Sequence, residues 1–340
     1  MIQKTELEII SGWDKLDRPA VSIACLTYNH ELYIKDALDS FLSQKTTFPY
    51  EIIIFDDAST DSNRGIIKKY KDNYPNIIKC IFPEQNQYKI HKRISVDFVF
   101  KYAMGKYIAI CEGDDFWIDP HKLQKQFDVL EKHPEIDLCL HPAYLLDDVS
   151  KKNIGVIGKY PVLPNTSIIS FEDVVYKTYG QLPTGSTFFR TSKFPVLEEF
   201  FESSQASIFD VFVHMITSYP NGAYLLDEIM SVYRINVAGS WNSNKYKFGL
   251  DNHVFKRSDA FVHLQRFVTN EDKELLINAV FKNYILNLKA TYINRATKLK
   301  ILTVIKTEIS TSQYWRFRLI AEFNLLYKVF IKLKNKLNFS

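Results

Sequence analysis

The first 140 residues alternate between two kinds of segment, and this alternation limits the possible folds more than any other feature of the sequence. Four short, nearly unbroken apolar runs are VSIACLTY (21–28), EIIIFDD (51–57), IIKCIF (77–82) and KYIAIC (106–111). Such runs are typical of strands that are covered on both faces. Segments between them, such as HELYIKDALDSFLSQ (30–44), repeat apolar residues at helical spacing. The sequence therefore predicts an α/β fold, with a Rossmann-like, mostly parallel sheet flanked by helices.

Polar side chains follow three of the four predicted strands. They are Thr27, Tyr28 and Asn29 after the first strand, Asp56 and Asp57 after the second, and Asp114 and Asp115 after the fourth. In sheets of this kind, ligands bind beyond the carboxyl ends of the strands. We therefore expect these residues to meet at one acidic rim where a ligand binds.

The segment CEGDDFW (111–117) brings three carboxylates together at the end of the fourth predicted strand. Gly followed by two Asp is also common in solvated turns, so the segment alone leaves a structural reading open. Adjacent like charges are costly unless a cation or a hydrogen-bond donor lies between them. Carboxylate oxygens suit a hard divalent ion such as Mn²⁺ or Mg²⁺. The spacing alone therefore predicts metal-assisted chemistry on a nucleotide.

The rest of the chain differs from this first part. Residues 137–250 are less regular, with strand candidates in DLCLHPAYLL, GSTFFR and AYLLDEIMSVYRI. From about residue 255 the pattern becomes helical, and residues 315–337 combine regularly spaced apolar side chains with six basic ones. Such a basic amphipathic helix can lie on an anionic membrane surface. Packing on its own domain, or on a second copy in a homo-oligomer, is the alternative.

Composition and charge restrict the class of protein further. The 340 residues, 46% hydrophobic and 24% charged, suffice for one large globular domain or two smaller ones. A net charge of +4 is too small to indicate nucleic-acid binding. The four cysteines lie far apart in apolar runs, so we expect buried thiols in a reducing compartment. Without an export signal or a run of ~18 apolar residues, the chain is expected to be cytoplasmic, with peripheral attachment to the inner face of the cell membrane through its tail.

Four motifs resemble those of the family 2 glycosyltransferases. They are VSIACLTYNHELYIKDALDSFLSQ, EIIIFDDASTD, GKYIAICEGDDFWIDPHKLQKQ and LLDEIMSVYRI, in the family's order. The resemblance implies a GT-A type fold, a nucleotide-sugar donor, with a UDP-sugar as the first expectation, and a glycan or lipid-linked acceptor. It divides the chain into an N-terminal extension (1–19), a glycosyltransferase domain (20–250) and a C-terminal helical region (251–340). Within the domain, residues 20–136 form the nucleotide-binding half and residues 137–250 the acceptor half.

The resemblance also implies roles for individual residues. The substrate-binding positions are Thr27, Tyr28, Asn29, Glu31, Asp57, Asp114 and Arg234. Among them, Tyr28 would pack near the base, Asp57 would contact it, and Asp114 would lie near the ribose or the sugar. Asp115 would hold the metal ion, Mn²⁺ or Mg²⁺, as the second carboxylate of the family's DXD-like motif.

The general base is expected in the second half of the domain. The family's order of motifs is met by GSTFFR (185–190), SIFDVFVHMI (207–216) and LLDEIMSVYR (225–234), and it makes Asp210 the catalytic residue. An Asp in the first turn of a helix is also favoured by the helix dipole, which is the structural alternative. The family frequently has His two residues after the Arg, whereas this chain has Asn236, whose amide carries no charge.

These features predict a metal-dependent, inverting glycosyltransferase that acts in cell-surface polysaccharide synthesis. One alternative is a sugar-1-phosphate nucleotidyltransferase, but its Gly-rich phosphate loop is not expected in a chain with only 11 Gly. Another is a catalytically weak binding or assembly subunit with the same fold, which Asn236 leaves open. Trp117 and Trp241 are either stacking platforms for a sugar or base, or core residues.

Overall fold

The computed structural model describes residues 4–14, 18–88, 90, 93–159, 167–176, 182–204, 206, 209–238, 260–276, 279, 294–306 and 310–322. The chain divides into two compact units, of which unit 1 contains residues 1–201 and 210–243, and unit 2 contains residues 202–209 and 244–340. Trp241 and most of the predicted helix from residue 274 lie outside the described residues, as does the tail after Glu322.

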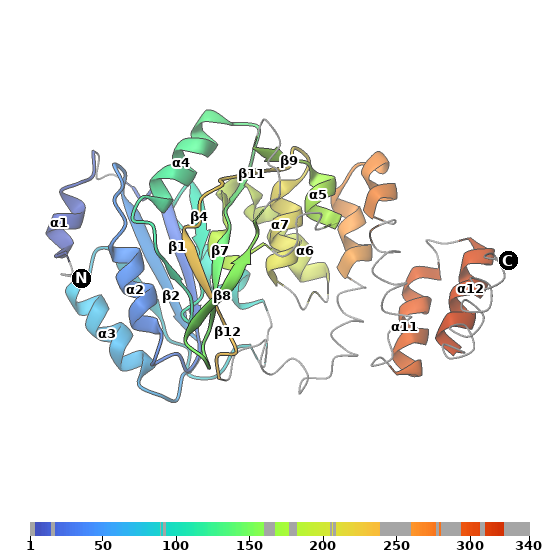
Figure 1. Ribbon diagram of the computed structural model, residues 1–340, viewed down its shortest axis with the longest axis horizontal. Helices are drawn as coiled ribbons and strands as arrows, with labels where there is room; N and C mark the ends of the chain where they lie inside the picture. Colours follow the sequence, from blue (N-terminus) through green and yellow to red (C-terminus); the bar gives the residue numbers. More distant parts are fainter. Residues whose placement is uncertain are drawn as a thin grey trace. The chain divides into compact units, whose positions relative to one another are not determined.

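Unit 1 is an α/β structure with two sheets (Figure 1). The larger sheet contains β1 (Val21–Thr27), β2 (Tyr50–Asp56), β3 (Ile78–Ile81), β4 (Tyr107–Ile110), β6 (Leu138–Leu140), β9 (Ile168–Ile169), β10 (Phe188–Arg190) and β11 (Ala223–Leu225). The smaller sheet contains β5 (Phe116–Trp117), β7 (Ala143–Asp147), β8 (Lys152–Ile157) and β12 (Ser231–Ile235). The α-helices are α1 (Glu6–Ile10), α2 (Ile34–Leu42), α3 (Asn63–Asn73), α4 (Lys122–Lys132), α5 (Phe171–Tyr176), α6 (Phe194–Ser203) and α7 (Phe209–Ser218). Short helical turns are η1 (Ser95–Val99), η2 (Phe100–Tyr102), η3 (Thr184–Ser186) and η4 (Thr191–Lys193).

The larger sheet has the strand order β3-β2-β1-β4-β10-β6-β11-β9. Its first four strands are parallel and are the four that the apolar runs predicted. β10 runs antiparallel to both β4 and β6, and β11 is again parallel to β6. The predicted α/β fold with a mostly parallel sheet is therefore confirmed.

Both faces of β1, β2 and β4 are buried, which explains why these strands are almost continuously apolar. On one face, Ile52 and Ile54 of β2 belong to a core cluster with Leu38 and Phe41 of α2. On the other face, the ring of Phe55 packs against Phe98 in η1, with 5.3 Å between the ring centroids. Figure 1 shows α2 and α3 on the first of these faces. Alternate side chains of one strand thus serve two different helical layers.

The smaller sheet, in the order β5-β12-β7-β8, was not predicted. The segment DLCLHPAYLL, taken as one strand candidate, divides at His141 and Pro142 into β6 of the larger sheet and β7 of the smaller one. A proline lacks the N–H that a central strand needs, so the break at Pro142 has a local cause. β12 pairs with β5 through Val232 and Phe116. This pairing brings the end of β12 beside the acidic turn that precedes β5.

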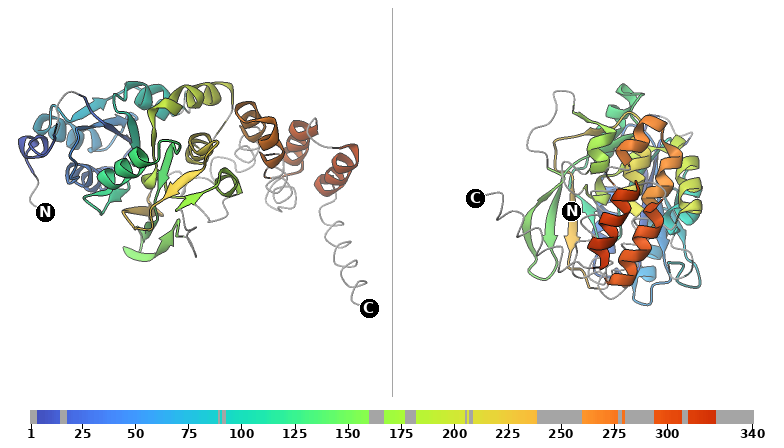
Figure 2. Two further views of the ribbon diagram at one scale, coloured as in Figure 1. Left: turned by 90° about the horizontal axis from the view of Figure 1, so that it is seen from above. Right: turned by 90° about the vertical axis from the view of Figure 1, so that its right-hand side faces the viewer.

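Unit 2 is helical in its described part, as the sequence predicted. It contains η5 (Gln265–Phe267), α11 (Arg295–Ile305) and α12 (Thr311–Glu322). α11 and α12 lie side by side (Figure 2), with Ile301, Leu302, Phe317 and Ala321 buried. Within the described ranges, no helix is both long enough and apolar enough to span a bilayer.

Candidate active site at the strand ends

The acidic turn that follows β4 forms a compact group of carboxylates. One carboxylate oxygen each of Glu112, Asp114 and Asp115 lies within 4.8 Å of the others. Asp114 and Asp115 are buried, whereas Glu112 reaches the surface. Gly113 lets the turn approach β1, because a Cβ at this position would lie 2.6 Å from Thr27 Oγ1. The turn is therefore packed against the end of a neighbouring strand and is not a freely solvated loop.

The electrostatics of this turn favour a bound cation. Burial, followed by the negative charges of Asp114 and Glu112, raises the pKa of Asp115 well above its ordinary value. The surrounding protein, followed by the charges of Asp114 and Asp210, raises the pKa of Glu112 to about 8. Glu112 and Asp115 thus resist ionisation in the absence of a cation, and a hard divalent ion held by this turn would compensate their charge.

Arg234 fixes the acidic turn from the end of β12. Its backbone N–H donates to Asp115 Oδ1 (2.8 Å), and its guanidinium donates to the carbonyl oxygen of Asp114 (2.6 Å) and to the Asp36 carboxylate. The guanidinium also lies over the rings of Phe116 and Tyr33, at 4.6 and 5.2 Å from their centroids. The side chain predicted to bind substrate is thus buried and engaged with the protein. Its contacts indicate a role in positioning the acids.

Asp210 lies in the first turn of α7, far from the acidic turn in sequence. It is half-buried, and its charge contributes to the raised pKa of Glu112. The fold thus brings the candidate base and the candidate metal ligands into one electrostatic neighbourhood. Tyr233 lies in the same neighbourhood, because burial and the charges of all four carboxylates raise its pKa. The sequence analysis did not select Tyr233.

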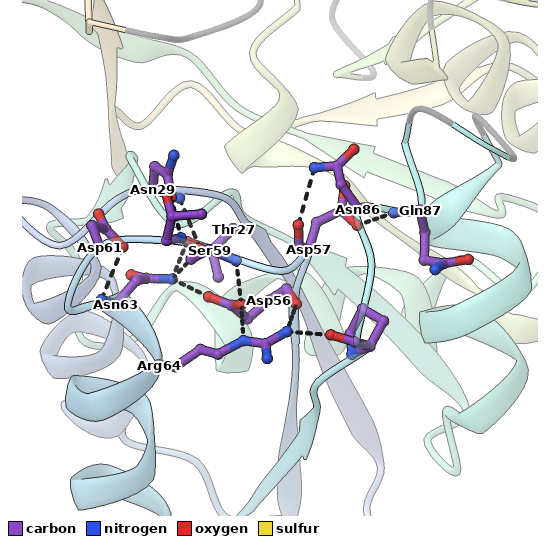
Figure 3. Close-up of polar contacts among 12 residues, drawn as sticks. Thr27, Asn29, Asp56, Asp57, Ser59, Asp61, Asn63, Arg64, Asn86 and Gln87 are labelled. Atoms are coloured by element: carbon purple, nitrogen blue, oxygen red, sulfur yellow. Dashed lines mark hydrogen bonds and ion pairs between the residues drawn. The ribbon is translucent and has the colours of Figure 1, made fainter.

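The ends of β1 and β2 are joined by a polar network (Figure 3). The fully buried Asp56 accepts hydrogen bonds from Arg64 Nε (2.7 Å), Asn63 Nδ2 (2.7 Å) and the backbone N–H of Ser59 (2.9 Å). Asn63 Nδ2 also donates to Thr27 Oγ1 (3.0 Å). Since the side-chain oxygens of Asp56 and Thr27 are engaged in this network, these two residues support the structure of the rim.

Asn29 and Glu31 attach the loop after β1 to the loop after β2. Asn29 adopts a left-handed φ of 54° and accepts a hydrogen bond from the N–H of Thr60 (2.8 Å). Glu31 accepts one from the N–H of Ser62 (2.8 Å), and its own N–H donates to Asp61 (3.0 Å). These two predicted substrate-binding residues therefore bind backbone groups of the protein and fix the shape of the rim.

The side chain of Asp57, directly after β2, contacts the loop that follows β3. Its Oδ1 and Oδ2 accept hydrogen bonds from the N–H groups of Gln87 (2.5 Å) and Tyr88 (3.1 Å), and its carbonyl oxygen accepts one from Asn86 (3.0 Å; Figure 3). Burial raises the pKa of Asp57, and the two N–H donors oppose that increase. The neighbouring rim residue Tyr28 is exposed.

Two further residues singled out in the sequence, Trp117 and Asn236, have structural roles. Trp117 is a core residue, because it is buried, packs on Phe41 with 4.7 Å between ring centroids and donates to the carbonyl oxygen of Gly185. The side-chain amide of Asn236 donates to Asp147 at the end of β7 (2.9 Å).

The expected buried thiols are found at Cys25, Cys111 and Cys139, while Cys80 is half-buried, and all four are free.

His30 is a rim residue that the sequence analysis missed. Its Nε2 lies 3.7 Å from Asp114 Oδ2. The signal was its position, since it stands between Asn29 and Glu31 directly after β1.

Comparison with known proteins supplies the family. Among curated relatives, an uncharacterized protein of Mycobacterium tuberculosis is 34% identical over 225 residues, which are 66% of this chain and 61% of that protein. The chain thus matches less than two thirds of that relative's length. The putative teichuronic acid biosynthesis glycosyltransferase TuaG of Bacillus subtilis is 32% identical over 113 residues, 33% of this chain and 42% of TuaG.

Two solved structures have the same fold. The mannosyltransferase PcManGT from Pyrobaculum calidifontis has a TM-score of 0.56 at 14% identity, covering 95% of this chain and 92% of that one. Residues 1–349 of S. aureus TarS give a TM-score of 0.52 at 18% identity, covering 89% of this chain and 90% of that one. These likenesses confirm the expected GT-A type fold. The model of the family described as "Glycosyl transferase family 2" matches residues 22–201, more than half of the chain, and the chain therefore belongs to this family.

Proposed function

We propose that this protein is a metal-dependent, inverting glycosyltransferase that moves a sugar from a nucleotide sugar to a hydroxyl of a glycan or lipid-linked acceptor. The observation that carries the proposal is the cluster of Glu112, Asp114 and Asp115, whose carboxylate oxygens lie within 4.8 Å of one another. The charge of Asp210 acts on the same cluster. Candidate metal ligands and a candidate base thus lie within electrostatic reach of one another.

The metal is Mn²⁺ or Mg²⁺, with Asp115 as its principal ligand. No hydrogen bond from a described residue reaches Asp115 Oδ2, while Oδ1 is held by Arg234. When bound, the ion supplies Lewis-acid stabilisation of a diphosphate leaving group. The PcManGT structure contains GDP-Man and Mn²⁺, which supports the same chemistry here.

The donor is a nucleotide sugar, with a UDP-sugar as the first candidate. A structure of TarS contains UDP-GlcNAc, whereas PcManGT binds GDP-Man, so the fold accommodates both nucleotides. Tyr28 offers an exposed ring for the base. It lies near Asp57, because the N–H of Asp57 donates a hydrogen bond to the carbonyl oxygen of Thr27, the residue before Tyr28. In this proposal Asp114 contacts the ribose or the sugar of the donor.

Asp210 deprotonates the acceptor hydroxyl, which then attacks the anomeric carbon opposite the leaving diphosphate. A carboxylate positioned within hydrogen-bond reach of the hydroxyl is the usual general base in such a step. Because attack and departure occur on opposite faces of the sugar, the anomeric configuration inverts.

The acceptor belongs to cell-surface polysaccharide synthesis, a proposal that the name of the relative TuaG, a putative teichuronic acid biosynthesis glycosyltransferase, supports. α12 exposes Trp315 and Leu319 on the same side, one turn apart, with the Arg318 guanidinium 5.3 Å from the Trp315 ring centroid. Aromatic and basic side chains together suit an anionic membrane surface, where a lipid-linked acceptor would be found. Contact with a second copy of the chain is the alternative use of this face.

A donor panel tests the proposal. Purified protein is mixed with UDP-, GDP- and TDP-sugars and Mn²⁺ or Mg²⁺, and released nucleoside diphosphate and thermal shift are measured. Metal-dependent release, lost in Asp210→Asn and retained in the exposed-site control Asp128→Asn, is the expected result. Pyrophosphate formation from a nucleoside triphosphate would instead identify a nucleotidyltransferase. Failure to bind any nucleotide sugar would leave only a binding or assembly role.

A further inference from the structure

His30 occupies an unusual position at the rim. Its Nε2 lies 3.7 Å from Asp114 Oδ2, and its side chain is 13% exposed. Its ring stands edge-on to Tyr33, with 6.3 Å between the ring centroids. Its other nitrogen, Nδ1, is buried and makes no hydrogen bond to any residue that the structure describes. The ring is therefore fixed by packing, and its exposed edge faces the carboxylate expected to lie beside the donor.

The surroundings of the two nitrogens decide which one carries the proton. An ionised carboxylate can only accept hydrogen bonds, so Asp114 favours a proton on Nε2. A buried N–H without an acceptor is rarer and more costly than a buried acceptor without a donor, so the unpartnered Nδ1 carries the lone pair. In neutral His30, Nε2–H is thus a hydrogen-bond donor beside the acidic turn, and 3.7 Å is too long for it to be fully used by Asp114.

Other nitrogen donors near this turn are engaged elsewhere. The Arg234 guanidinium donates to the Asp114 carbonyl oxygen and to Asp36. The Asn236 amide donates to Asp147. Lys122 is fully buried and donates to Gln126 Oε1 at 2.6 Å. Of these four side chains, His30 is the one that can turn its N–H to a ligand without breaking a short hydrogen bond.

A diphosphate at this rim would need such a donor, because the described acidic turn presents three carboxylates. A metal ion compensates the charge of the diphosphate, but it does not satisfy all of the oxygens. We propose that His30 is a donor-binding residue, whose Nε2–H donates a hydrogen bond to a diphosphate oxygen of the nucleotide sugar. The inference rests on the proposed function, which it extends to a residue that holds the leaving group.

The test compares a nucleoside diphosphate with its nucleoside. UDP and uridine, each with Mn²⁺, are titrated into the full chain by calorimetry, with ligand-detected NMR for weak nucleoside binding. His30→Leu removes the donor, His30→Gln keeps an N–H close to the Nε2 position, and His133→Leu is the control because His133 pairs with Glu135 on the surface. GDP and guanosine replace the uracil pair if the wild type prefers them.

Removing a hydrogen bond to a charged group is expected to weaken binding by about tenfold or more. His30→Leu should weaken UDP binding by that factor, with uridine and Mn²⁺ affinities changing less than about twofold. His30→Gln should restore most of the UDP affinity, and His133→Leu should match wild type. Unchanged UDP binding in folded His30→Leu would overturn the inference, as would equal losses for UDP and uridine. A wild type that binds neither UDP nor GDP would instead refute the proposed function together with this inference.

Discussion

The backbone N–H of Arg234 donates to Asp115 Oδ1 over 2.8 Å, although the two residues are 119 positions apart in the chain. The same arginine donates to the carbonyl oxygen of Asp114. The acidic turn after β4 is thus held by β12, the strand of the smaller sheet that comes last in the sequence. A residue from the second half of unit 1 thus fixes the candidate metal ligands in the first half.

Arg234→Lys should weaken both the fold and the site. Lysine keeps the charge but cannot reach the Asp114 carbonyl oxygen and the Asp36 carboxylate together, so we expect the free energy of unfolding to fall by about 1–3 kcal/mol. Turnover should fall because the acidic turn is no longer held in place. Chemical denaturation and the donor assay measure the two effects, with the exposed Arg316→Lys on α12 as a neutral control. A variant as stable and active as that control would show that these contacts are dispensable.

Asp115→Asn should separate metal binding from folding. The Asn Oδ1 still accepts the N–H of Arg234, and a buried carboxylate with a raised pKa has been removed. We expect metal-free thermal stability to be unchanged or higher near neutral pH. The stabilisation by Mn²⁺ should disappear, and turnover should drop about 10²-fold or more. Loss of metal-free stability would mean that Asp115 is mainly a structural residue.

The pH dependence of stability should reveal the carboxylate cluster. Desolvation by the surrounding protein, followed by neighbouring charges, raises the pKa of Asp115, and it raises that of Glu112, whose side chain reaches the surface, to about 8. In the unfolded chain both groups lose their protons at lower pH, so the cluster costs the metal-free protein stability as pH rises from about 4.5 to about 8. Mn²⁺ replaces those protons, and the increase in Tm that it causes should therefore grow over the same window. Thermal scans with and without Mn²⁺ measure this, and Asp115→Asn should flatten the difference.

Gly113→Ala and Gly65→Ala form a matched pair. A Cβ at Gly113 would lie 2.6 Å from Thr27 Oγ1 and 2.7 Å from Thr27 Cβ, whereas at Gly65 in α3 it would meet nothing within 4 Å. We expect Gly113→Ala to lower the free energy of unfolding by about 1–3 kcal/mol. Gly65→Ala should raise it by about 0.5–1 kcal/mol, through helix propensity. Equal effects in chemical denaturation would contradict the close packing of the acidic turn on β1.

The sequence was informative where one strand is buried on both faces. β1 to β4 were predicted because each is a nearly unbroken apolar run. The acids after β4 were selected as candidate site residues because they stand at the carboxyl end of such a run. The smaller sheet was missed because β5 has only two residues and β8 is an exposed strand, with polar Lys152 and Asn153 at its start. Neither carries a pattern that a short window can detect.

Site residues were harder to interpret than site positions. Thr27, Asn29, Asp56 and Glu31 all lie at the predicted rim, yet their polar atoms bind other parts of the protein. A sequence shows that a carboxylate stands at a strand end, but not which backbone N–H groups it meets there. The partners of Thr27, Asn29 and Glu31 lie 31 to 36 positions further along the chain.

The crowding of Glu112, Asp114 and Asp115 has a kinetic consequence. A nucleoside diphosphate that arrived before the ion would approach three carboxyl groups with oxygens no more than 4.8 Å apart. Each of them that is ionised would repel the diphosphate and slow its encounter with this turn. Under the proposed function we therefore expect faster binding when the ion is already bound or travels with the nucleotide, so the geometry of one turn favours an order of assembly.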